Sequence, residues 1–376
     1  MTFNGSPTPG LDATLGLQAF VKSVDARGGI DGYKLVYKFC SLGPSLQSES
    51  PNLSATCAHE AVSNHVTAVV GTFDAFDNVA MPILQAAGIP EIGNFPESDI
   101  DFTSKWSTPL LASTEVLSAG AAQELIQVAH CKTIGYIALQ GAPTEPESAR
   151  GITAVAKAFN VKFPAPQLVP STVSDYGPAV TTLKSKGVDC LVDGFQSPQD
   201  TQPLARAVSQ AGIAHLGMIS TNVPTTVLKA MGSAANGIYA IESSNQDALV
   251  NNFHPGKINA AERQMLSDFK KYEPAAMTMN PLNYPDWGAG QIFAQVLRAI
   301  VAKHEPVNHA NIEKTVNSIT VNPGVFPPSN FSKPGPVPGE PRVHATTLNY
   351  LKIINDTLTP LDRKNHNVGP ALLKFG

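Results

Sequence analysis

The stretch that decides the fold is AVVGTFDAFDNVAMPILQAAG, residues 68–88. It begins as an apolar run, breaks at Gly71, becomes polar and aromatic, and continues as a helix-forming segment that ends at Gly88. This order predicts a buried strand, a short loop and a helix, as in an open α/β sheet. Ligands of such sheets bind beyond the carboxyl ends of the strands, where helix N-termini present unpaired N–H groups. Residues 72–78 are therefore a candidate ligand loop, and an ordinary βα turn with two packed phenylalanines is the alternative.

Length and composition indicate a two-domain protein with ample material for buried cores. The chain has 376 residues, 43% of them hydrophobic and 15% charged, and a formal net charge of −4. This balance, without a run of Lys or Arg, argues against nucleic acid and against a membrane-surface patch as partners. No apolar stretch approaches the roughly 20 residues that span a bilayer. Residues 1–6 have neither a charged nor an apolar signal region, so we expect no signal peptide in this sequence.

The four cysteines favour two disulfides. Cys40 and Cys57 lie in one predicted βα unit, Cys131 immediately precedes an apolar run, and Cys190 lies inside another. No C-x-x-C pair and no zinc-finger spacing occurs. We favour the pairs Cys40–Cys57 and Cys131–Cys190, which would imply an oxidising compartment. Four buried free thiols are the alternative.

Hydrophobic periodicity predicts two successive β/α series. In the first, we expect helices at 10–26, 53–64 and 79–88 and strands at 33–40, 66–70 and 89–93. In the second, we expect helices at 114–129, 147–159, 176–186 and 199–210 and strands at 132–139, 167–169, 188–192 and 216–219. Parallel strands need crossover helices, so each series should form a doubly wound sheet.

The last third of the chain has a different pattern. A strand at 237–240 is followed by expected helices at 260–272, 287–302 and 308–317. The Pro- and Gly-rich region 321–341 should be irregular, and the segment 346–354 is typical of an edge strand.

In this order, the segments resemble the type I periplasmic binding proteins, in the branch that binds leucine, isoleucine and valine for ABC importers. The most specific part is VDARGGIDGYKL, residues 24–35, which is similar to the family's N-A-x-G-G-I-x-G-x-x-L. Residues 69–71 resemble its third strand and pocket loop, and residues 88–92 its G-I-P-x-I. Residues 175–176 with 187–189 resemble its D-[FY]…G-x-D, and residues 286–289 lie where it has a Tyr-Asp-Ala helix start. The resemblance spans nearly the whole chain.

The resemblance implies an α/β fold of two Rossmann-like doubly wound lobes, joined by a three-crossover hinge, that close on a ligand. Lobe 1 would comprise residues 1–113 and 245–322, and lobe 2 residues 114–244 and 323–376. The family opens with a central strand, whereas here only residues 1–4 precede the loop-like Gly5-Ser6-Pro7, so the first strand should be short or missing.

The resemblance also implies partners and a location. The partners would be a small-molecule ligand and an ABC permease, with no nucleic acid and no cofactor. The protein would be a monomer that meets the membrane only through a lipid anchor or the permease. It would be periplasmic or a cell-surface lipoprotein. Many members of the family have a disulfide near the pocket-side loop.

The implied pocket lacks the usual anchors for an amino acid. In amino-acid-binding members, a Ser and a Thr of lobe 1 hold the carboxylate, and an acidic residue of lobe 2 holds the ammonium. These positions fall near Ala75, near Phe95 or Pro96, and near Thr221 or Asn222. Because burying an unpaired charge costs several kcal/mol, we expect a ligand other than an ordinary α-amino acid.

The other residues of the implied pocket form an aromatic and amide-rich lining, which suits a neutral or weakly polar molecule. Asp74 and Glu145 could accept hydrogen bonds from hydroxyls or an amine, and core packing is an alternative role for several phenylalanines and for Tyr284. The candidate ligand-binding residues are Ser6, Phe73, Asp74, Ala75, Phe76, Asn94, Phe95, Gln140, Glu145, Phe195, Gln196, Thr221, Asn222 and Tyr284.

The sequence does not favour an enzyme. It contains no G-x-S-x-G elbow, no phosphate-binding G-x-x-x-x-G-K-[ST] loop and no H-E-x-x-H, and its nine His show no metal-ligand spacing. We therefore expect no catalytic residue and no metal ligand. The alternative to a transport role is a ligand-sensing receptor or regulator module of the same fold.

Overall fold

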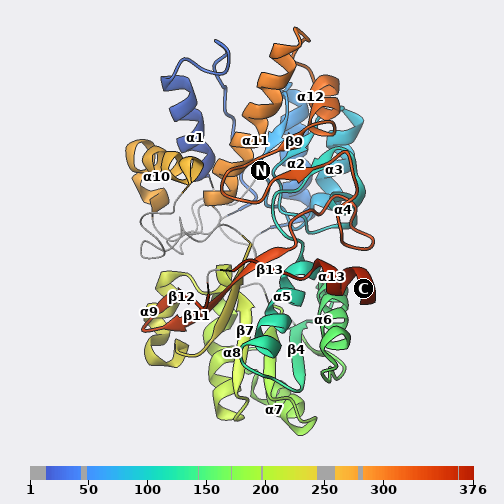
Figure 1. Ribbon diagram of the computed structural model, residues 1–376, viewed down its shortest axis with the longest axis vertical. Coiled ribbons are helices and arrows are strands. Elements are labelled where there is room, and N and C mark those ends of the chain that lie inside the picture. The colour runs from blue at the N-terminus through green and yellow to red at the C-terminus, as the bar shows by residue number, and fades with distance from the viewer. Residues whose placement is uncertain are drawn as a thin grey trace. The chain divides into compact units, whose positions relative to one another are not determined.

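The structure is a computed structural model that describes residues 14–43, 49–142, 144–170, 172–195, 198–243, 259–277, 283–362 and 364–376. The chain divides into two compact units (Figure 1). Unit 1 consists of Met1–Ala112, Asp247–Gly335 and Gly339–Ala345, and unit 2 of Ser113–Gln246, Pro336–Pro338 and Thr346–Gly376. Among the described residues, no helix combines the length and the apolar character that crossing a membrane requires.

Unit 1 contains a short parallel sheet in the order β1-β2-β3, formed by Val69–Val70, Glu91–Ile92 and Ser107–Thr108. A separate antiparallel pair joins β9 (Thr320–Val321) and β10 (Ser329–Asn330). The helices are α1 (Leu15–Ala26), α2 (Pro51–Ser63), α3 (Asp77–Ala86), α4 (Asp99–Thr103), α10 (Ala260–Tyr272), α11 (Asn283–Ala302) and α12 (His309–Val316), with the 3₁₀ turn η4 (Pro274–Met277).

The core of unit 1 forms around α11, which starts four residues before the predicted helix. Trp287 is fully buried, its ring meets that of Phe20 edge-on at 5.8 Å, and its Nε1–H donates to Asp268 at 3.0 Å. An indole with a bonded N–H is a stable core group. The helices α1 and α11 thereby pack together in the core of unit 1.

Residues 34–40 form no strand, contrary to expectation. Their side chains alternate between exposed and half-buried, yet only Tyr33 pairs, in an isolated bridge with Ile30. Within the described residues the outer edge of β1 is also unpaired, and a cavity of about 670 Å³ is lined by both segments and by α11. A strand needs a partner for its N–H and C=O groups, so alternation alone does not make one.

Residues 323–335 and 339–345 belong to unit 1, although lobe 2 was expected to contain them. The Arg342 guanidinium explains this difference. It donates to the carbonyl oxygen of Ser107 in β3 from Nε (2.9 Å) and Nη2 (2.6 Å), and it lies over the ring of Phe331 at 4.7 Å. Since Arg342 is only 7% exposed, these bonds fix the segment to the sheet of unit 1.

Unit 2 contains an eight-stranded sheet in the order β12-β11-β8-β7-β6-β4-β5, with β13 also paired to β11. The strands are β4 (Ile134–Leu139), β5 (Gln167–Val169), β6 (Cys190–Asp193), β7 (His215–Ile219), β8 (Tyr239–Glu242), β11 (Thr347–Ile354), β12 (Thr357–Pro360) and β13 (His366–Asn367). The helices are α5 (Thr114–Gln127), α6 (Glu145–Phe159), α7 (Gly177–Ser185), α8 (Pro198–Gln210), α9 (Thr225–Met231) and α13 (Gly369–Phe375), with the 3₁₀ turns η2 (Ser220–Asn222) and η3 (Gly232–Ala235).

The five strands from β5 to β8 are parallel, as the second series predicts. The strand β11 is not an edge strand, contrary to expectation. It pairs antiparallel with β8 on one side and with β12 and β13 on the other. Asn355 and Asp356 both have positive φ, 49° and 58°, as a tight turn of type I′ requires, so the chain turns back and adds β12 as the edge.

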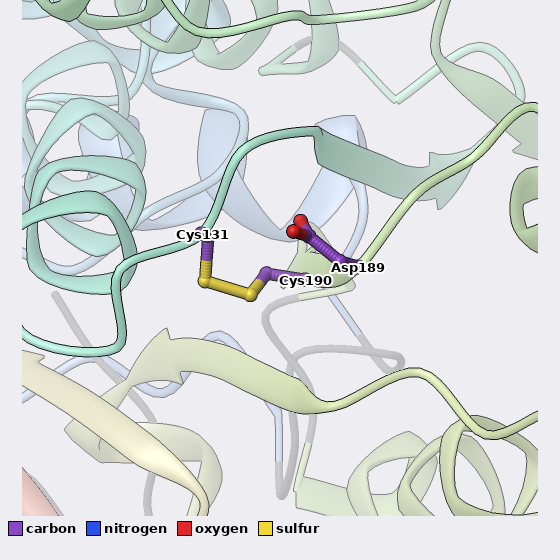
Figure 2. A group of neighbouring side chains, drawn as sticks. All are labelled: Cys131, Asp189 and Cys190. Atoms are coloured by element: carbon purple, nitrogen blue, oxygen red, sulfur yellow. A yellow bond between two sulfur atoms is a disulfide. The ribbon is translucent and has the colours of Figure 1, made fainter.

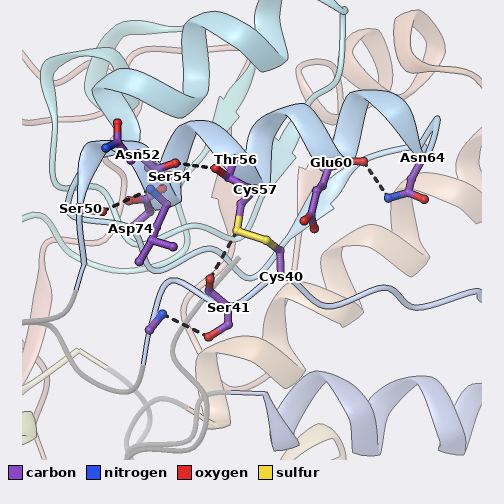
Figure 3. Close-up of a disulfide and its surroundings, with 12 residues drawn as sticks. Cys40, Ser41, Ser50, Asn52, Ser54, Thr56, Cys57, Glu60, Asn64 and Asp74 are labelled. Carbon is purple, nitrogen blue, oxygen red and sulfur yellow. Dashed lines mark hydrogen bonds between the residues drawn. A yellow bond between two sulfur atoms is a disulfide. The ribbon is translucent and has the colours of Figure 1, made fainter.

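Both expected disulfides are present. Cys40–Cys57 joins the extended segment 34–40 to α2 (Figure 3), and Cys131–Cys190 joins the start of the second series to β6 (Figure 2). The carboxylate of Asp189 lies beside the second disulfide and accepts the backbone N–H groups of Lys132 and Thr133. Because both sulfurs are bonded to each other, this group of side chains is structural and not a metal site.

Candidate functional site

Two loops of unit 1 follow parallel strands at the same edge of the sheet. The loop 71–76 follows β1 and the loop 93–98 follows β2, and the Phe95 N–H donates to the Thr72 carbonyl at 2.8 Å. The rings of Phe73 and Phe95 stack with centroids 4.9 Å apart and planes 10° apart. Phe73 is half-buried and Phe95 is 8% exposed, so the stack presents part of one aromatic face. The structure therefore brings together two of the aromatic candidates.

Asp74 organises the first loop. Its Oδ1 accepts the Phe76 N–H at 2.8 Å and its Oδ2 accepts the Ser54 hydroxyl of α2 at 2.7 Å (Figure 3). Burial raises the pKa of this carboxyl, and the two hydrogen bonds oppose that rise. Both oxygens of Asp74 are thus engaged within unit 1.

Glu49 is a member of this site that the sequence did not reveal, since it lies in a polar stretch without periodicity. Its Oε2 accepts the N–H of Ala75 at 3.0 Å, and the side chain is 8% exposed. Burial raises its pKa to about 9. Burial likewise raises the pKa of Glu97 to about 8, with the Asp101 charge adding to the effect. These acids are therefore mostly protonated at neutral pH.

Asn94 belongs to a buried network. Its Nδ2 donates to Asp101 Oδ1 at 3.2 Å and to the Ser107 hydroxyl at 3.0 Å, and the side chain is 1% exposed. Ala75 and Phe76 are half-buried, and Phe76 is the residue that precedes α3. The loop at the start of α3 is thus the accessible part of this region, and Asn94 supports it from inside.

In unit 2, the carboxyl end of β6 carries a buried acid that holds two loops. Asp193 Oδ1 accepts the Phe195 N–H at 2.8 Å, and its Oδ2 accepts Asn222 Nδ2 at 3.0 Å. The Asn222 carbonyl in turn accepts the Thr201 hydroxyl at 2.9 Å. Burial raises the pKa of Asp193 to about 7. Asp193 was not among the candidates, because it reads as the last residue of an apolar strand.

Aromatic rings line the same end of β6. The Phe195 ring lies 4.8 Å from that of Tyr176, whose hydroxyl donates to Asp200 at 2.6 Å. Gly194 allows the ring of Tyr136 to approach, since a Cβ there would be 2.4 Å from it. Because of this packing Phe195 is only 6% exposed, so its side chain belongs mainly to the core of unit 2.

A second acid at a strand end of the same sheet also accepts hydrogen bonds from loop residues. Glu242, at the end of β8, accepts the Ser220 hydroxyl and, at 2.8 Å, the Ser243 N–H. Thr221 is half-buried in η2 next to Ser220, Gln140 is exposed after β4, and Glu145 is the half-buried first residue of α6. All of these groups lie at or after the carboxyl ends of the parallel strands of one sheet, which is where ligands of α/β folds bind.

One candidate has another position, and two are not described. Tyr284 is 3% exposed in the core of unit 1, where its ring meets that of Phe269 at 5.6 Å. Ser6 and Gln196 lie outside the described residues.

The loops share one electrostatic feature. Four backbone N–H groups, those of Ala75, Phe76, Phe195 and Ser243, already donate to a carboxyl group of the chain. The acceptors are Glu49, Asp74, Asp193 and Glu242 respectively. The loop sequences 71–76, 93–98, 140–145, 193–198 and 220–224 contain no Lys or Arg. The strand ends of both units therefore offer acids, amides and rings, and those four N–H groups are not free for an anion.

A family model described as "Periplasmic binding protein" matches residues 4–341. The chain belongs to this family. No curated protein is similar enough to give a match. Solved structures share the fold at low identity, so they are informative about architecture alone.

Three of these structures show the range of relatives. A possible leucine/isoleucine/valine-binding protein from Rhodopirellula baltica SH 1 has a TM-score of 0.76 at 16% identity, covering 96% of this chain and 94% of its own. A leucine-binding protein from Thermotoga maritima has a TM-score of 0.73 at 12% identity, covering 96% and 97%. An ABC-transporter solute-binding protein from R. palustris, in complex with benzoate, has a TM-score of 0.72 at 16% identity, covering 97% and 95%.

Family membership confirms the prediction of a type I periplasmic binding protein with the α/β fold of that class. Proteins of this family bind solutes and are not enzymes, which agrees with the lack of catalytic motifs. The family also implies a location outside the cytoplasm. The general role is thus that of a solute-binding protein related to ABC transporters.

Replacing Asn222 with Ala is expected to lower the free energy of unfolding by about 1–3 kcal/mol, because the buried Asp193 carboxyl loses a donor. Urea unfolding followed by far-UV circular dichroism measures the change. Thr221→Ala is the matched control, since its half-buried side chain lies next to Asn222 without bonding Asp193. Equal losses in the two variants would contradict a specific role of the Asn222–Asp193 bond.

Proposed function

We propose that the protein captures a small neutral or basic molecule between its two units by hinge closure, and delivers it to an ABC permease. We base the choice of ligand on one observation: four loop N–H groups donate to carboxyl groups of the chain itself. An anionic ligand would find no Lys or Arg in these loops and would have to displace a carboxyl group. A ligand with donors, in contrast, finds acceptors at several strand ends.

The same feature argues against an ordinary α-amino acid. The carboxylate of such a ligand needs donors, and the N–H of Ala75, which lies where the family's serine would be, donates to Glu49. Bringing a ligand carboxylate into this low-dielectric space without a free donor to bind it would cost several kcal/mol. Benzoate, which the R. palustris protein binds, is an anion too, so we expect a different ligand here.

The aromatic stack supports a ligand with a planar or apolar part. The ring of Phe73 is half-buried in the free protein and rests on Phe95. A ligand ring placed on this face would gain offset stacking and would cover apolar surface. We infer that Phe73 is the main apolar contact of unit 1.

A screen with matched pairs tests the proposal. Thermal shift is measured with benzoate against benzylamine and benzamide, and with leucine against leucinamide and leucinol. The member without a carboxylate should raise the melting temperature and its acid partner should not. A strong shift by leucine or benzoate would overturn the choice of ligand class, while leaving a solute-binding role in place.

Phe73→Ala should weaken binding of a ligand found in this screen about tenfold or more, since burying an aromatic side chain contributes about 1.5–3 kcal/mol. Isothermal titration calorimetry measures the effect. Phe159→Ala, in an exposed ring at the end of α6, is the matched control and should bind as the wild type does. Unchanged affinity in Phe73→Ala would contradict the assigned contact.

Hinge closure and delivery have separate tests. Contacts with both units would be available only in a closed form, so a bound ligand should shift the population towards it. Small-angle scattering at saturating ligand should then give a smaller radius of gyration, and an unchanged radius would count against closure. We further propose a monomer that meets the membrane only through a lipid anchor or the permease, and cell fractionation of the native protein tests for the anchor.

A further inference from the structure

Three acidic side chains of unit 1 converge in its interior. Asp77 begins α3, Glu91 lies in β2 and Asp101 lies in α4, so three separate elements contribute one acid each. One carboxyl oxygen from each of the three lies within 4.8 Å of those of the other two, and the side chains are 2%, 0% and 0% exposed. Like charges at this separation repel strongly in a low-dielectric interior, so the three acids require either protons or a cation.

The hydrogen bonds of the group are unevenly distributed. Asp101 accepts Asn94 Nδ2, the N–H groups of Glu97 and Ser98, and the Ser98 hydroxyl, at 2.8–3.2 Å. Neither oxygen of Asp77 and neither oxygen of Glu91 accepts a hydrogen bond of normal geometry from any N–H or hydroxyl of the described residues. Buried polar atoms in native proteins nearly always have a partner, so these four oxygens need either protons shared with the neighbouring acids or a cation.

A neutral oxygen faces the same group. The Thr72 hydroxyl lies close enough to Glu91 to lower the pKa of that carboxyl. Its own oxygen, on a side chain that is 3% exposed, forms no hydrogen bond of normal geometry. The hydroxyl thus faces the carboxyls with a lone pair that no hydrogen bond of normal geometry occupies.

We propose that Asp77, Glu91 and Asp101, together with the Thr72 hydroxyl, bind one Ca²⁺ ion inside unit 1. Ca²⁺ takes six to eight oxygen ligands at about 2.3–2.6 Å, so two oxygens on one ion are up to about 5 Å apart, which the observed spread meets. A set made only of oxygens suits a hard cation and not zinc or copper. Mg²⁺ demands shorter bonds and retains several waters, which a fully buried site does not favour.

Protons are the competing explanation. Burial raises the pKa of Asp77 and brings that of Glu91 to about 7, so in the absence of an ion the acids hold protons near neutral pH. Protons and a cation compete for the same oxygens, and binding of the ion would release them. The experiment must therefore ask whether Ca²⁺ binds at all and whether these residues hold it.

The site would support the loop that precedes α3. Asp77 immediately follows the half-buried Phe76, and Asp101 holds the loop 93–98 through the N–H groups of Glu97 and Ser98. An ion between them would fix both loops to β2. This structural role is independent of the ligand class proposed above.

The test uses the full chain, first purified without chelator for metal analysis by mass spectrometry, and then stripped with EGTA. We expect about one equivalent of Ca²⁺ before stripping. Adding Ca²⁺ at about a hundredfold excess over its Kd should raise the melting temperature by about 5–10 °C. Tryptophan fluorescence reports this transition for unit 1, because both tryptophans of the chain, Trp106 and Trp287, lie there.

Asp77→Asn and Glu91→Gln should each abolish the Ca²⁺-dependent shift in melting temperature. Both variants are made so that the test remains possible if one of them does not fold. Glu124→Gln, a fully buried acid of unit 2, is the matched control and should keep the wild-type response. Absence of Ca²⁺ from the native protein together with no shift on its addition would overturn the proposal and leave the acids as a proton-sharing group. A shift that survives in Asp77→Asn and Glu91→Gln would also overturn it, and a response to Mg²⁺ alone would overturn the choice of ion.

Discussion

Raising the pH from about 5 to about 9 is expected to destabilise unit 1 by several kcal/mol, and Glu49 should account for a large part of this loss. Its carboxyl has a folded-state pKa of about 9 against an ordinary value of 4.5, and burial is the main cause. Each pKa unit corresponds to about 1.4 kcal/mol, so Glu49 alone should lower the free energy of unfolding by an amount on the order of 5 kcal/mol over this pH range. Glu97, with a pKa of about 8, acts in the same direction.

The sign follows from proton linkage. Between pH 4.5 and 9 the folded protein keeps a proton on Glu49 that the unfolded chain has lost, so the folded state binds more protons. Stability is therefore fully present below the ordinary pKa and is lost as the pH rises towards the folded-state value. A melting temperature followed by tryptophan fluorescence in EGTA should fall by about 10 °C or more over this range.

Glu49→Gln separates this effect from other titrations. The amide oxygen can still accept the Ala75 N–H, but the side chain can no longer ionise. The variant should match the wild type near pH 5 and exceed it at pH 9. Glu60→Gln, in an exposed acid of α2, is the control and should keep the wild-type slope. A wild-type profile that is flat or rises with pH would contradict the assignment, as would an equally steep fall in Glu49→Gln.

The sequence predicted most long elements because their apolar residues repeat with the period of a helix or a strand. The helix α10 begins and ends at the expected residues, and β5 does as well. Periodicity gave wrong predictions where the formation of a strand depended on pairing with another strand. Residues 34–40 alternate as a strand does but pair with no described strand, whereas β12 depends on a two-residue turn with positive φ at Asn355 and Asp356.

The site was predictable only in part, for a related reason. The loops after β1 and β2 follow from the strand–loop–helix order, and the two candidates Phe73 and Phe95 on these loops lie together in the structure. A buried acid leaves no periodic signal, however. Glu49 comes from a polar stretch, and Glu91 and Asp101 meet Asp77 only through the packing of three elements. Such groups become visible only when coordinates show that they are buried and close together.

Reducing both disulfides is expected to lower the free energy of unfolding by about 7 kcal/mol. In the chain-entropy model, a disulfide stabilises by restricting the unfolded chain, and the effect grows with the length of the closed loop. Cys40–Cys57 spans 17 residues and should contribute about 3 kcal/mol, and Cys131–Cys190 spans 59 and should contribute about 4 kcal/mol. Chemical denaturation with and without a strong reductant, followed by far-UV circular dichroism, measures the total.

Paired serine variants assign the total to its two sources. Cys40→Ser with Cys57→Ser removes a link within unit 1, and should therefore lower the midpoint of the transition seen by tryptophan fluorescence. Cys131→Ser with Cys190→Ser removes a link within unit 2, where no tryptophan of the chain lies, so its main effect should be seen by circular dichroism. A midpoint that complete reduction leaves unchanged would contradict stabilisation by these bonds. A larger loss from the shorter loop would show that packing around Cys57 on α2, and not loop length, sets the contribution of each bond.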